Sequence, residues 1–197
     1  MNFFQKDLQK LEPVQRKITA INERKPSTIW LFGPTSSGKT TIAMALLEMI
    51  RDMGEKAILY DGDEIRELFH HDFGFSETNR LKVVSTLVHF ANKTTKAGVF
   101  AIVSALTANQ SARDSMRRDI ECLVDVYLDC PISTCIKRDP KGIYQKAIAG
   151  DIDTVIGYNS PYLKSKKACL TINTSAISVN KAARRIKNYL ELKWEGS

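Results

Sequence analysis

Short apolar runs alternate along the chain with stretches whose apolar residues are spaced as on one face of a helix. The runs predict strands over residues 28–32, 57–60, 99–103, 124–128 and 168–172. The run over residues 99–103 is apolar on both faces, which is typical of buried parallel strands. Between and after them, the spacing predicts helices over residues 39–53, 80–97, 112–121 and 132–138, and one that Ser178 caps. This alternation predicts an α/β three-layer fold, with a mainly parallel sheet of about five strands and helices on both faces.

Two stretches fall outside this alternation. Residues 1–26 form a polar N-terminal arm, and residues 139–167 have little apolar periodicity and no expected part in the core. A loop of that length inside a compact domain is usually functional. No repeat, low-complexity segment or linker divides the chain, so we expect residues 1–197 to form a single domain.

Composition fits a soluble globular protein, since 43% of the residues are hydrophobic and 26% are charged. The formal net charge of +7 would suit a partner such as nucleic acid, a membrane surface or an acidic small molecule. However, residues 31–162 carry 15 Lys+Arg and 17 Asp+Glu, so the basic excess lies in the two ends. The charge therefore does not indicate a core that binds nucleic acid, and we expect no nucleic-acid partner.

The four cysteines are Cys122, Cys130, Cys135 and Cys169. None forms a CxxC pair and no histidine cluster lies near them, which argues against a zinc site. We expect buried free thiols in a reducing compartment. The N-terminus lacks the apolar core of a signal peptide, and no apolar stretch approaches the length of a membrane span, so we expect a cytoplasmic protein without a membrane partner.

Residues 33–40 read GPTSSGKT and match the GxxxxGK[ST] pattern of a P-loop (Walker A), between a predicted strand and a predicted helix. Gly33 and Gly38 allow backbone angles and close approaches that a Cβ would block. Backbone N–H groups would surround phosphate oxygens, Lys39 would reach the β- and γ-phosphates, and Thr40 would ligate Mg²⁺. The predicted ATP site comprises Gly33, Pro34, Thr35, Ser36, Ser37, Gly38, Lys39, Thr40 and Thr41.

A pair of carboxylates, Asp61 and Asp63, closes the second predicted strand. The carboxyl ends of parallel strands are where open α/β sheets bind ligands. One carboxylate would position Mg²⁺ or its waters, and the other would accept a proton from an acceptor hydroxyl. The alternative is a structural turn in which Asp63 is the N-cap of a helix over residues 64–69. Beside a P-loop we favour catalysis, with Asp63, Lys39 and Asp61 as catalytic residues and Mg²⁺ at Thr40 and Asp61.

With these residues in place, the chain resembles the adenylylsulfate kinases, P-loop enzymes that phosphorylate the 3′-hydroxyl of adenosine 5′-phosphosulfate. The similarity runs in order from Val14 to Pro161 and carries several motifs. They are LYDGDEIR at residues 59–66, GFS at 74–76 followed by Arg80, two arginines at 113 and 117, and RDPKGIY at 138–144. The resemblance implies ATP and Mg²⁺ as cofactors, a small nucleotide as substrate, a homodimer, and a mobile lid within residues 139–167.

The resemblance also implies roles for single residues. Asp63 would be the base for the 3′-hydroxyl and Asp61 would support it, while Phe75 would stack on the acceptor base. Arg66 and Arg80 would hold the phosphosulfate end, because a guanidinium fork matches oxyanions. The implied acceptor contacts are Asp63, Arg66, Phe75, Arg80, Lys141, Gly157 and Tyr158.

The chain departs from the family pattern on the acceptor side. Where the family pattern has a polar residue or an arginine, this chain has Val83, Ser85, Gln110 and Ile148. Val155 stands where the family has a second stacking phenylalanine. Two acceptors stay open: adenylylsulfate in a repacked pocket, with Tyr158 a possible replacement ring, or another nucleotide. The latter would be a cytidine-diphosphate derivative such as cytidine diphosphoramidate, used in surface polysaccharide biosynthesis. A non-catalytic nucleotide-binding module and a nucleic-acid-stimulated NTPase are further alternatives. We favour adenylylsulfate, because the remaining motifs are intact.

Overall fold

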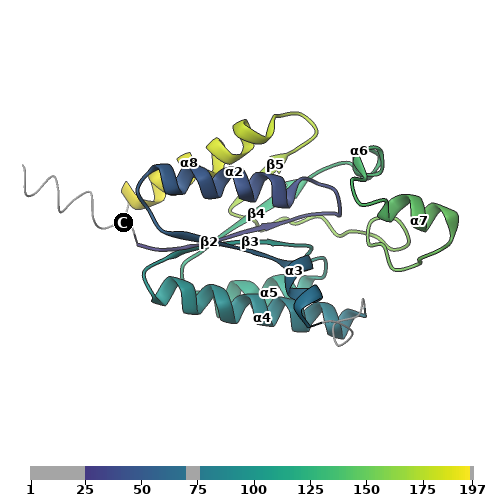
Figure 1. The fold of residues 1–197 in the computed structure, drawn as a ribbon, viewed down its shortest axis with the longest axis horizontal. Coiled ribbons are helices and arrows are strands. Elements are labelled where there is room, and N and C mark those ends of the chain that lie inside the picture. The colour runs from purple at the N-terminus through teal and green to yellow at the C-terminus, as the bar shows by residue number, and fades with distance from the viewer. Residues whose placement is uncertain (1–24, 70–75, 196–197) are drawn as a thin grey trace, which may run out of the picture.

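The computed structural model describes residues 25–69 and 76–195. Nearly all of the predicted N-terminal arm, and Phe75, therefore lie outside the described residues. The described part contains one five-stranded parallel sheet in the order β2-β3-β1-β4-β5 (Figure 1). Its strands are β1 (Thr28–Phe32), β2 (Ala57–Asp61), β3 (Phe100–Ala105), β4 (Leu123–Asp129) and β5 (Leu170–Asn173). The predicted fold class is confirmed, and the predicted strand positions agree to within two residues at each end.

Helices cover both faces of the sheet. α2 (Lys39–Asp52) and α8 (Val179–Glu195) lie on one face, and α4 (Glu77–Lys96) and α5 (Gln110–Asp119) lie on the other (Figure 1). The shorter helices lie at the carboxyl ends of the strands: α3 (Gly62–Leu68), α6 (Ile132–Arg138) and α7 (Ile143–Ala149). Ser178 caps α8 as predicted, since its hydroxyl accepts a hydrogen bond from the amide of Lys181 at 3.3 Å.

The central strand β1 explains why this sequence makes a three-layer fold. Ile29 and Leu31 point into the core under α2 and α8, whereas Trp30 and Phe32 point into the core under α4 and α5. All of them are fully buried. Side chains alternate across a strand, so a strand that is apolar at every position needs a cover on each face.

The stretch 139–167 differs from the sequence expectation. It contains α7, and Tyr144, Ala147 and Val155 are buried in a third apolar cluster with Cys130 and Cys135. The prediction that this stretch has no part in a core is therefore wrong. Its apolar residues are few, yet they meet the end of β4 and α6, and that is enough to fold a small separate core.

The cysteine expectation holds in part. Cys130 and Cys135 are buried free thiols, and Cys122 is half-buried, whereas Cys169 is exposed beside the edge strand β5. The prediction of a buried thiol is wrong for Cys169. Among the described residues, no helix has both the length and the apolar character that a membrane span requires.

The strand order places a crevice at one end of the sheet. The chain leaves β1 through α2 on one face, and it leaves the neighbouring β3 through α5 on the opposite face (Figure 1). The two connections diverge at the carboxyl ends of these strands, and such switch points are where α/β sheets bind ligands. The P-loop and residues 106–109 are these two connections.

Candidate functional site

The P-loop has the geometry that its glycines predict. Gly38 has a φ of 94° and precedes the first residue of α2, so the helix begins at the loop. A Cβ on Gly33 would lie 2.6 Å from the carbonyl oxygen of Leu128, a distance that no side chain tolerates. Glycine is therefore required at Gly38 for its backbone angle and at Gly33 for close approach. The loop presents the N-terminus of α2 to the crevice, where it can bind an anion.

Lys39 lies across the mouth of this loop. Its Nζ donates hydrogen bonds to the carbonyl oxygens of Gly33 at 3.1 Å and Pro34 at 2.7 Å. Burial lowers the pKa of Lys39 to about 8, although the carboxylates of Asp63 and Asp61 oppose the shift. The ammonium is thus held where it has lost part of its solvation, and an incoming phosphate would restore favourable charge contacts.

Thr40, Asp61 and Ser104 bring three oxygen atoms together next to the P-loop. The hydroxyl of Thr40 donates to Asp61 Oδ2 at 2.7 Å and lies 3.2 Å from the hydroxyl of Ser104. Hydroxyl and carboxylate oxygens are hard ligands, and Mg²⁺ typically takes one or two such groups along with substrate phosphates and water. This donor set fits Mg²⁺, as the sequence predicted for Thr40 and Asp61.

The two carboxylates of the Asp61–Asp63 pair have different surroundings. Asp61 is buried, and its Oδ1 accepts a hydrogen bond from the amide of Asp63 at 2.8 Å, which makes Asp61 the N-cap of α3. The alternative in which Asp63 caps that helix is therefore wrong. The side chain of Asp63 is 72% exposed and lines the crevice. Capping thus fixes Asp61 in place and leaves Asp63 available to a ligand.

Lys141 reaches Asp63 from the lid side. The two form an ion pair with Nζ 2.7 Å from Oδ2, and this hydrogen bond raises the pKa of Lys141. Both side chains are more than half exposed, so the pair contributes little to stability. The position of the pair matters more. It joins two residues that are 78 positions apart in sequence, and one of them is Asp63, to which the sequence analysis assigns proton transfer.

These groups line one cavity of about 670 Å³. Of the predicted site residues, its lining includes Thr35, Ser36, Gly38, Lys39, Thr40, Thr41, Asp61, Asp63, Arg66, Arg80 and Lys141. Gly33, Pro34 and Ser37 lie behind it and shape the loop. Gly157 and Tyr158 are not part of the lining, and Tyr158 is 44% exposed. Phe75 lies outside the described residues.

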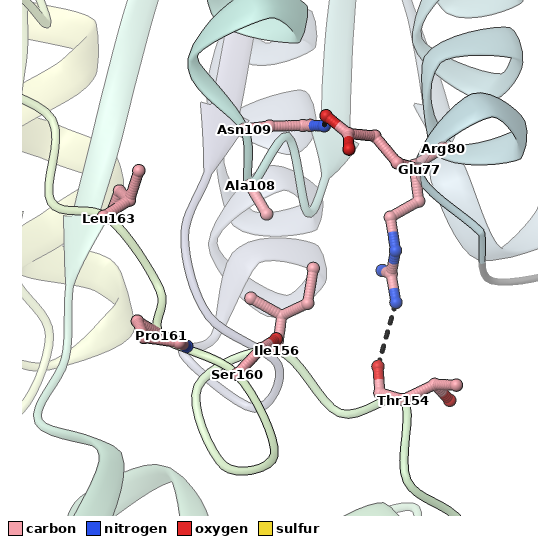
Figure 2. Close-up of a pocket in the computed structure, with 9 residues that line it drawn as sticks. All are labelled: Glu77, Arg80, Ala108, Asn109, Thr154, Ile156, Ser160, Pro161 and Leu163. Atoms are coloured by element: carbon pink, nitrogen blue, oxygen red, sulfur yellow. Dashed lines mark hydrogen bonds between the residues drawn. The ribbon is translucent and has the colours of Figure 1, made fainter.

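A smaller cavity of about 330 Å³, whose lining includes no P-loop residue, adjoins this cleft. Figure 2 shows its lining residues. The two share five lining residues: Arg80, Ala108, Asn109, Thr154 and Ile156. Arg80 donates from Nη2 to the carbonyl oxygen of Thr154 at 2.9 Å, as Figure 2 shows. Burial lowers the pKa of both Arg66 and Arg80. Arg80 thus lies at the junction of the cavities and Arg66 lies in the large cleft, where an anionic group of a ligand would meet them.

The departures from the family pattern fall into two groups. Val83 and Val155 are buried and line the large cleft, so they change its wall. Ser85, Gln110 and Ile148 are exposed and belong to neither cavity lining. Gln110 bonds instead to Asp114 on the next turn of α5, at 2.7 Å. The acceptor side is therefore altered chiefly by two valines.

Sequence reasoning missed several residues that shape the site. Ser104 is the one hydroxyl in the otherwise apolar β3, a signal that could have found it. Arg138 donates to the carbonyl oxygen of Thr174 at 2.6 Å, and the hydroxyl of Thr174 donates to the carbonyl oxygen of Ser37 at 2.9 Å. Tyr144 donates to the carbonyl oxygen of Thr35 at 3.2 Å. The P-loop is thus held by the end of α6, by Tyr144 of α7 and by the loop after β5.

Comparison with known proteins places this geometry in context. Residues 25–173 match the family described as adenylylsulphate kinase. A probable adenylyl-sulfate kinase of Pyrococcus abyssi is 36% identical over 159 residues, which are 81% of this chain and 91% of that protein. The adenylyl-sulfate kinase of Clostridium acetobutylicum is 35% identical over 170 residues, covering 86% of this chain and 85% of the other.

A solved structure is similar over nearly the same span. It is the Mycobacterium tuberculosis APS kinase in complex with AMPPNP and APS, with a TM-score of 0.81 and 31% identity. The match covers 85% of this chain and 98% of that one. Sequence and backbone therefore agree on the same group of proteins.

Proposed function

Because the chain belongs to the adenylylsulphate kinase family, we propose that it transfers the γ-phosphoryl group of ATP to the 3′-hydroxyl of adenosine 5′-phosphosulfate. The main observation in support is that the P-loop residue Lys39, the hydrogen-bonded Thr40–Asp61 pair and Asp63 all line one cleft. Phosphoryl transfer needs positioning and charge stabilisation more than covalent chemistry, and this cleft supplies both.

On the ATP side, the P-loop amides and the N-terminus of α2 bind the phosphate oxygens. Lys39 leaves the carbonyl oxygens of Gly33 and Pro34 and contacts the β- and γ-phosphates, which keep its ammonium charged. Thr40 and Asp61 would hold Mg²⁺, with Ser104 beside them, and the ion supplies neutralisation of phosphate charge when bound. Arg138 and Thr174 keep the loop in shape during transfer.

On the acceptor side, Asp63 accepts the proton of the attacking hydroxyl. Its exposed carboxylate can reach a ligand, and its backbone is fixed by the cap that Asp61 provides. Arg66 and Arg80, which both line the cleft, hold the phosphosulfate end. Lys141 moves with the lid segment and covers the reacting groups, which limits access of water as a competing acceptor.

The comparisons favour adenylylsulfate over the cytidine-diphosphate derivative, because the relatives compared above carry adenylyl-sulfate kinase names at 31–36% identity. They equally favour a catalyst over a non-catalytic binding module. The two valines of the cleft wall, Val83 and Val155, are compatible with a repacked pocket for the same acceptor. Their apolar surface can contact the flat face of a purine, although a valine stacks less well than an aromatic ring.

A coupled assay of ATP consumption tests the proposal. Purified protein is mixed with MgATP and a panel of acceptors: adenylylsulfate, adenosine 5′-diphosphate, and CDP- and UDP-type compounds. We expect turnover with adenylylsulfate at least tenfold above any pyrimidine acceptor. Turnover on a pyrimidine acceptor with none on adenylylsulfate would overturn the assignment. Mass spectrometry of the product separates phosphorylation of the acceptor from hydrolysis of ATP.

We further propose that the chain works in the cytoplasm, where ATP is supplied, as a homodimer in which residues 139–167 act as a lid on a single kinase domain. The homodimer rests on resemblance to the family alone. Light scattering coupled to size-exclusion chromatography tests it directly, since a mass near twice 22.2 kDa is expected. A mass near 22.2 kDa at micromolar concentration would contradict it.

A further inference from the structure

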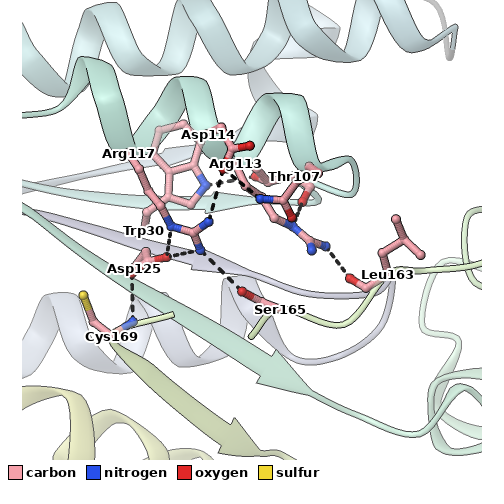
Figure 3. A network of polar contacts seen from close by, with 10 residues as sticks. Trp30, Thr107, Arg113, Asp114, Arg117, Asp125, Leu163, Ser165 and Cys169 are labelled. Carbon is pink, nitrogen blue, oxygen red and sulfur yellow. Dashed lines mark hydrogen bonds and ion pairs between the residues drawn. The ribbon is translucent and has the colours of Figure 1, made fainter. Parts of the chain in front are cut away.

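Arg113 of α5 is fully buried behind the acceptor side of the cleft and is absent from both cavity linings (Figure 3). Its guanidinium lies between two aromatic rings, 5.3 Å from the ring centre of Phe32 and 5.2 Å from that of Tyr162. Two aromatic faces make a favourable setting for a desolvated cation. An amphipathic helix normally places arginine in solvent, so this burial calls for a reason beyond packing.

The hydrogen bonds of Arg113 connect two segments that are far apart in sequence. Nε donates to the carbonyl oxygen of Thr107 at 2.9 Å, and Nη2 donates to that of Leu163 at 2.7 Å. Nη1 has no hydrogen-bond partner within the described residues. Burying this guanidinium therefore costs free energy, because one of its nitrogens is left without a hydrogen bond. In return, its two hydrogen bonds fix the distance between the carbonyl groups of Thr107 and Leu163.

Both connected segments form walls of the site. Thr107 lines the large cleft, and Leu163 lines the smaller cavity of Figure 2. Thr107 also has a φ of 38°, which is unfavourable for a β-branched residue. Trp30 holds its side chain, since the indole Nε1 donates to Thr107 Oγ1 at 2.9 Å. Strained residues persist only where neighbours over-determine them, and Thr107 is held at both its side chain and its carbonyl.

A second hydrogen bond joins the same two segments. The hydroxyl of Tyr162 donates to the carbonyl oxygen of Leu106 at 3.1 Å, while its ring covers the guanidinium. One turn further along α5, Arg117 bonds to buried Asp125 and reaches Ser165 at 3.4 Å (Figure 3). The wall after β3 and the segment that returns from the lid are therefore fastened together at several points.

From these contacts we propose that Arg113 is a positioning residue for the acceptor. It sets the separation between residues 106–109 and residues 154–163, the two walls of the acceptor side, without touching either substrate. The proposal rests on the proposed function for which substrate occupies that side. Because Arg113 bonds to no residue of the P-loop, its loss should change acceptor binding and leave ATP binding nearly unaltered.

The test compares Arg113→Met, which keeps much of the stem but removes both hydrogen bonds, with Arg113→Lys and Tyr162→Phe. For Arg113→Met we expect the KM of the acceptor to rise about tenfold or more, because small displacements of a bound substrate are costly, while the KM of ATP changes less than about twofold. Arg113→Lys should recover part of the loss, since one ammonium cannot reach both carbonyls as a fork does. Tyr162→Phe keeps the ring and should raise the acceptor KM by a smaller factor.

Hydrogen exchange of the unliganded enzyme gives a readout that does not depend on the acceptor's identity. Faster exchange confined to residues 105–109 and 154–165 is expected in Arg113→Met, and Arg118→Met on the exposed side of α5 should behave as the wild type. If wild-type protein fails to use adenylylsulfate, the proposed function fails, but the exchange result still decides the role of Arg113. Should Arg113→Met not fold, Arg113→Lys carries both measurements. Equal increases in the two KM values, or unchanged exchange in both segments, would overturn the proposal.

Discussion

Asp63 is the residue on which turnover should depend most. Its carboxylate is exposed to the cleft, and the Asp61 cap holds its backbone. Asp63→Asn keeps the shape but removes the proton acceptor, so we expect kcat to fall by about 10²- to 10⁴-fold, the range of general-base catalysis. ATP affinity, measured by calorimetry, should stay within about threefold, because the P-loop is unchanged.

An exposed carboxylate of the lid segment supplies the control for this variant. Asp153→Asn removes the same charge outside the cleft lining and should leave kcat unaltered. Turnover retained in Asp63→Asn would exclude Asp63 as the base. A loss of ATP binding in the same variant would instead indicate a structural role for Asp63.

Lys39 should couple ATP binding to proton uptake. Burial lowers the pKa of Lys39 to about 8, below its ordinary value of 10.5, so the free enzyme loses this proton as pH rises above 8. Bound phosphates favour the ammonium form and return the proton. Calorimetry at pH 9, in two buffers of different ionisation enthalpy, should therefore show uptake of a proton on ATP binding that nearly vanishes at pH 7. Equal proton uptake at both pH values would contradict this.

The lowered pKa of Lys39 also determines how the free energy of unfolding changes with pH. Between pH 8 and 10.5 the unfolded chain binds this proton and the folded chain does not, so the contribution of Lys39 to the free energy of unfolding increases with pH. Below pH 8 both states bind it, and the cost of burying the charge is present in full.

At the scale of elements, an ion pair whose carboxylate is buried joins α5 to β4. Asp125 is 2% exposed and accepts hydrogen bonds from Arg117 at 2.6 and 2.9 Å and from the amide of Cys169 at 2.9 Å. Asp125→Ala leaves a half-buried guanidinium and an amide without their carboxylate partner. We expect the free energy of unfolding, measured in urea, to fall by about 3–5 kcal/mol.

The exposed pair on the same helix is the matched control. Asp119 and Arg118 are also within hydrogen-bond distance, at 2.8 Å, yet both face solvent. Asp119→Ala should therefore give no measurable change in the urea midpoint. Comparable losses of unfolding free energy in the two variants would mean that the contribution of the Asp125 pair does not depend on its burial.

The elements also show what periodicity can and cannot predict. The strand over residues 28–32 and the helix after it were predictable, because apolar spacing and P-loop glycines agree there. α7 was not, since Tyr144 and Ala147 are the only members of its seven residues that are buried. Their three-residue spacing was a weak helical signal, but the cluster forms only once Cys135 and Val155 arrive from elsewhere in the fold.

Among site residues, those in contiguous motifs were predictable and those that act through the fold were not. Lys39, Thr40, Asp61 and Asp63 lie where the sequence placed them, in one cleft. Arg113 belongs to a motif that the sequence analysis named, but its burial was not predictable, because its two aromatic partners lie 81 and 49 positions away in the chain. The backbone strain of Thr107 leaves no trace in the sequence, since it comes from neighbours and not from residue type.

For the whole molecule, the net charge of +7 is a poor guide to where anions bind. Arg184 and Arg185 are exposed on α8 and belong to neither cavity lining, whereas Arg66 and Arg80 line the cleft. Charges are screened beyond about 8 Å at physiological ionic strength. We therefore expect the double variant Arg184→Gln, Arg185→Gln to keep kcat/KM for the acceptor within about twofold.

The equivalent change inside the cleft should behave differently, although it alters the net charge by the same amount. Arg66→Gln, Arg80→Gln removes two guanidiniums that would contact the acceptor's anionic end, so kcat/KM should fall by about 10²-fold or more, since each charge-assisted bond contributes about 1.5–3 kcal/mol. Steady-state rates for both double variants at 0.05 and 0.3 M salt separate contact from long-range attraction. A large, salt-dependent loss in the α8 variant would show that the basic end of the chain draws the substrate in, and that the field of the whole protein contributes to binding.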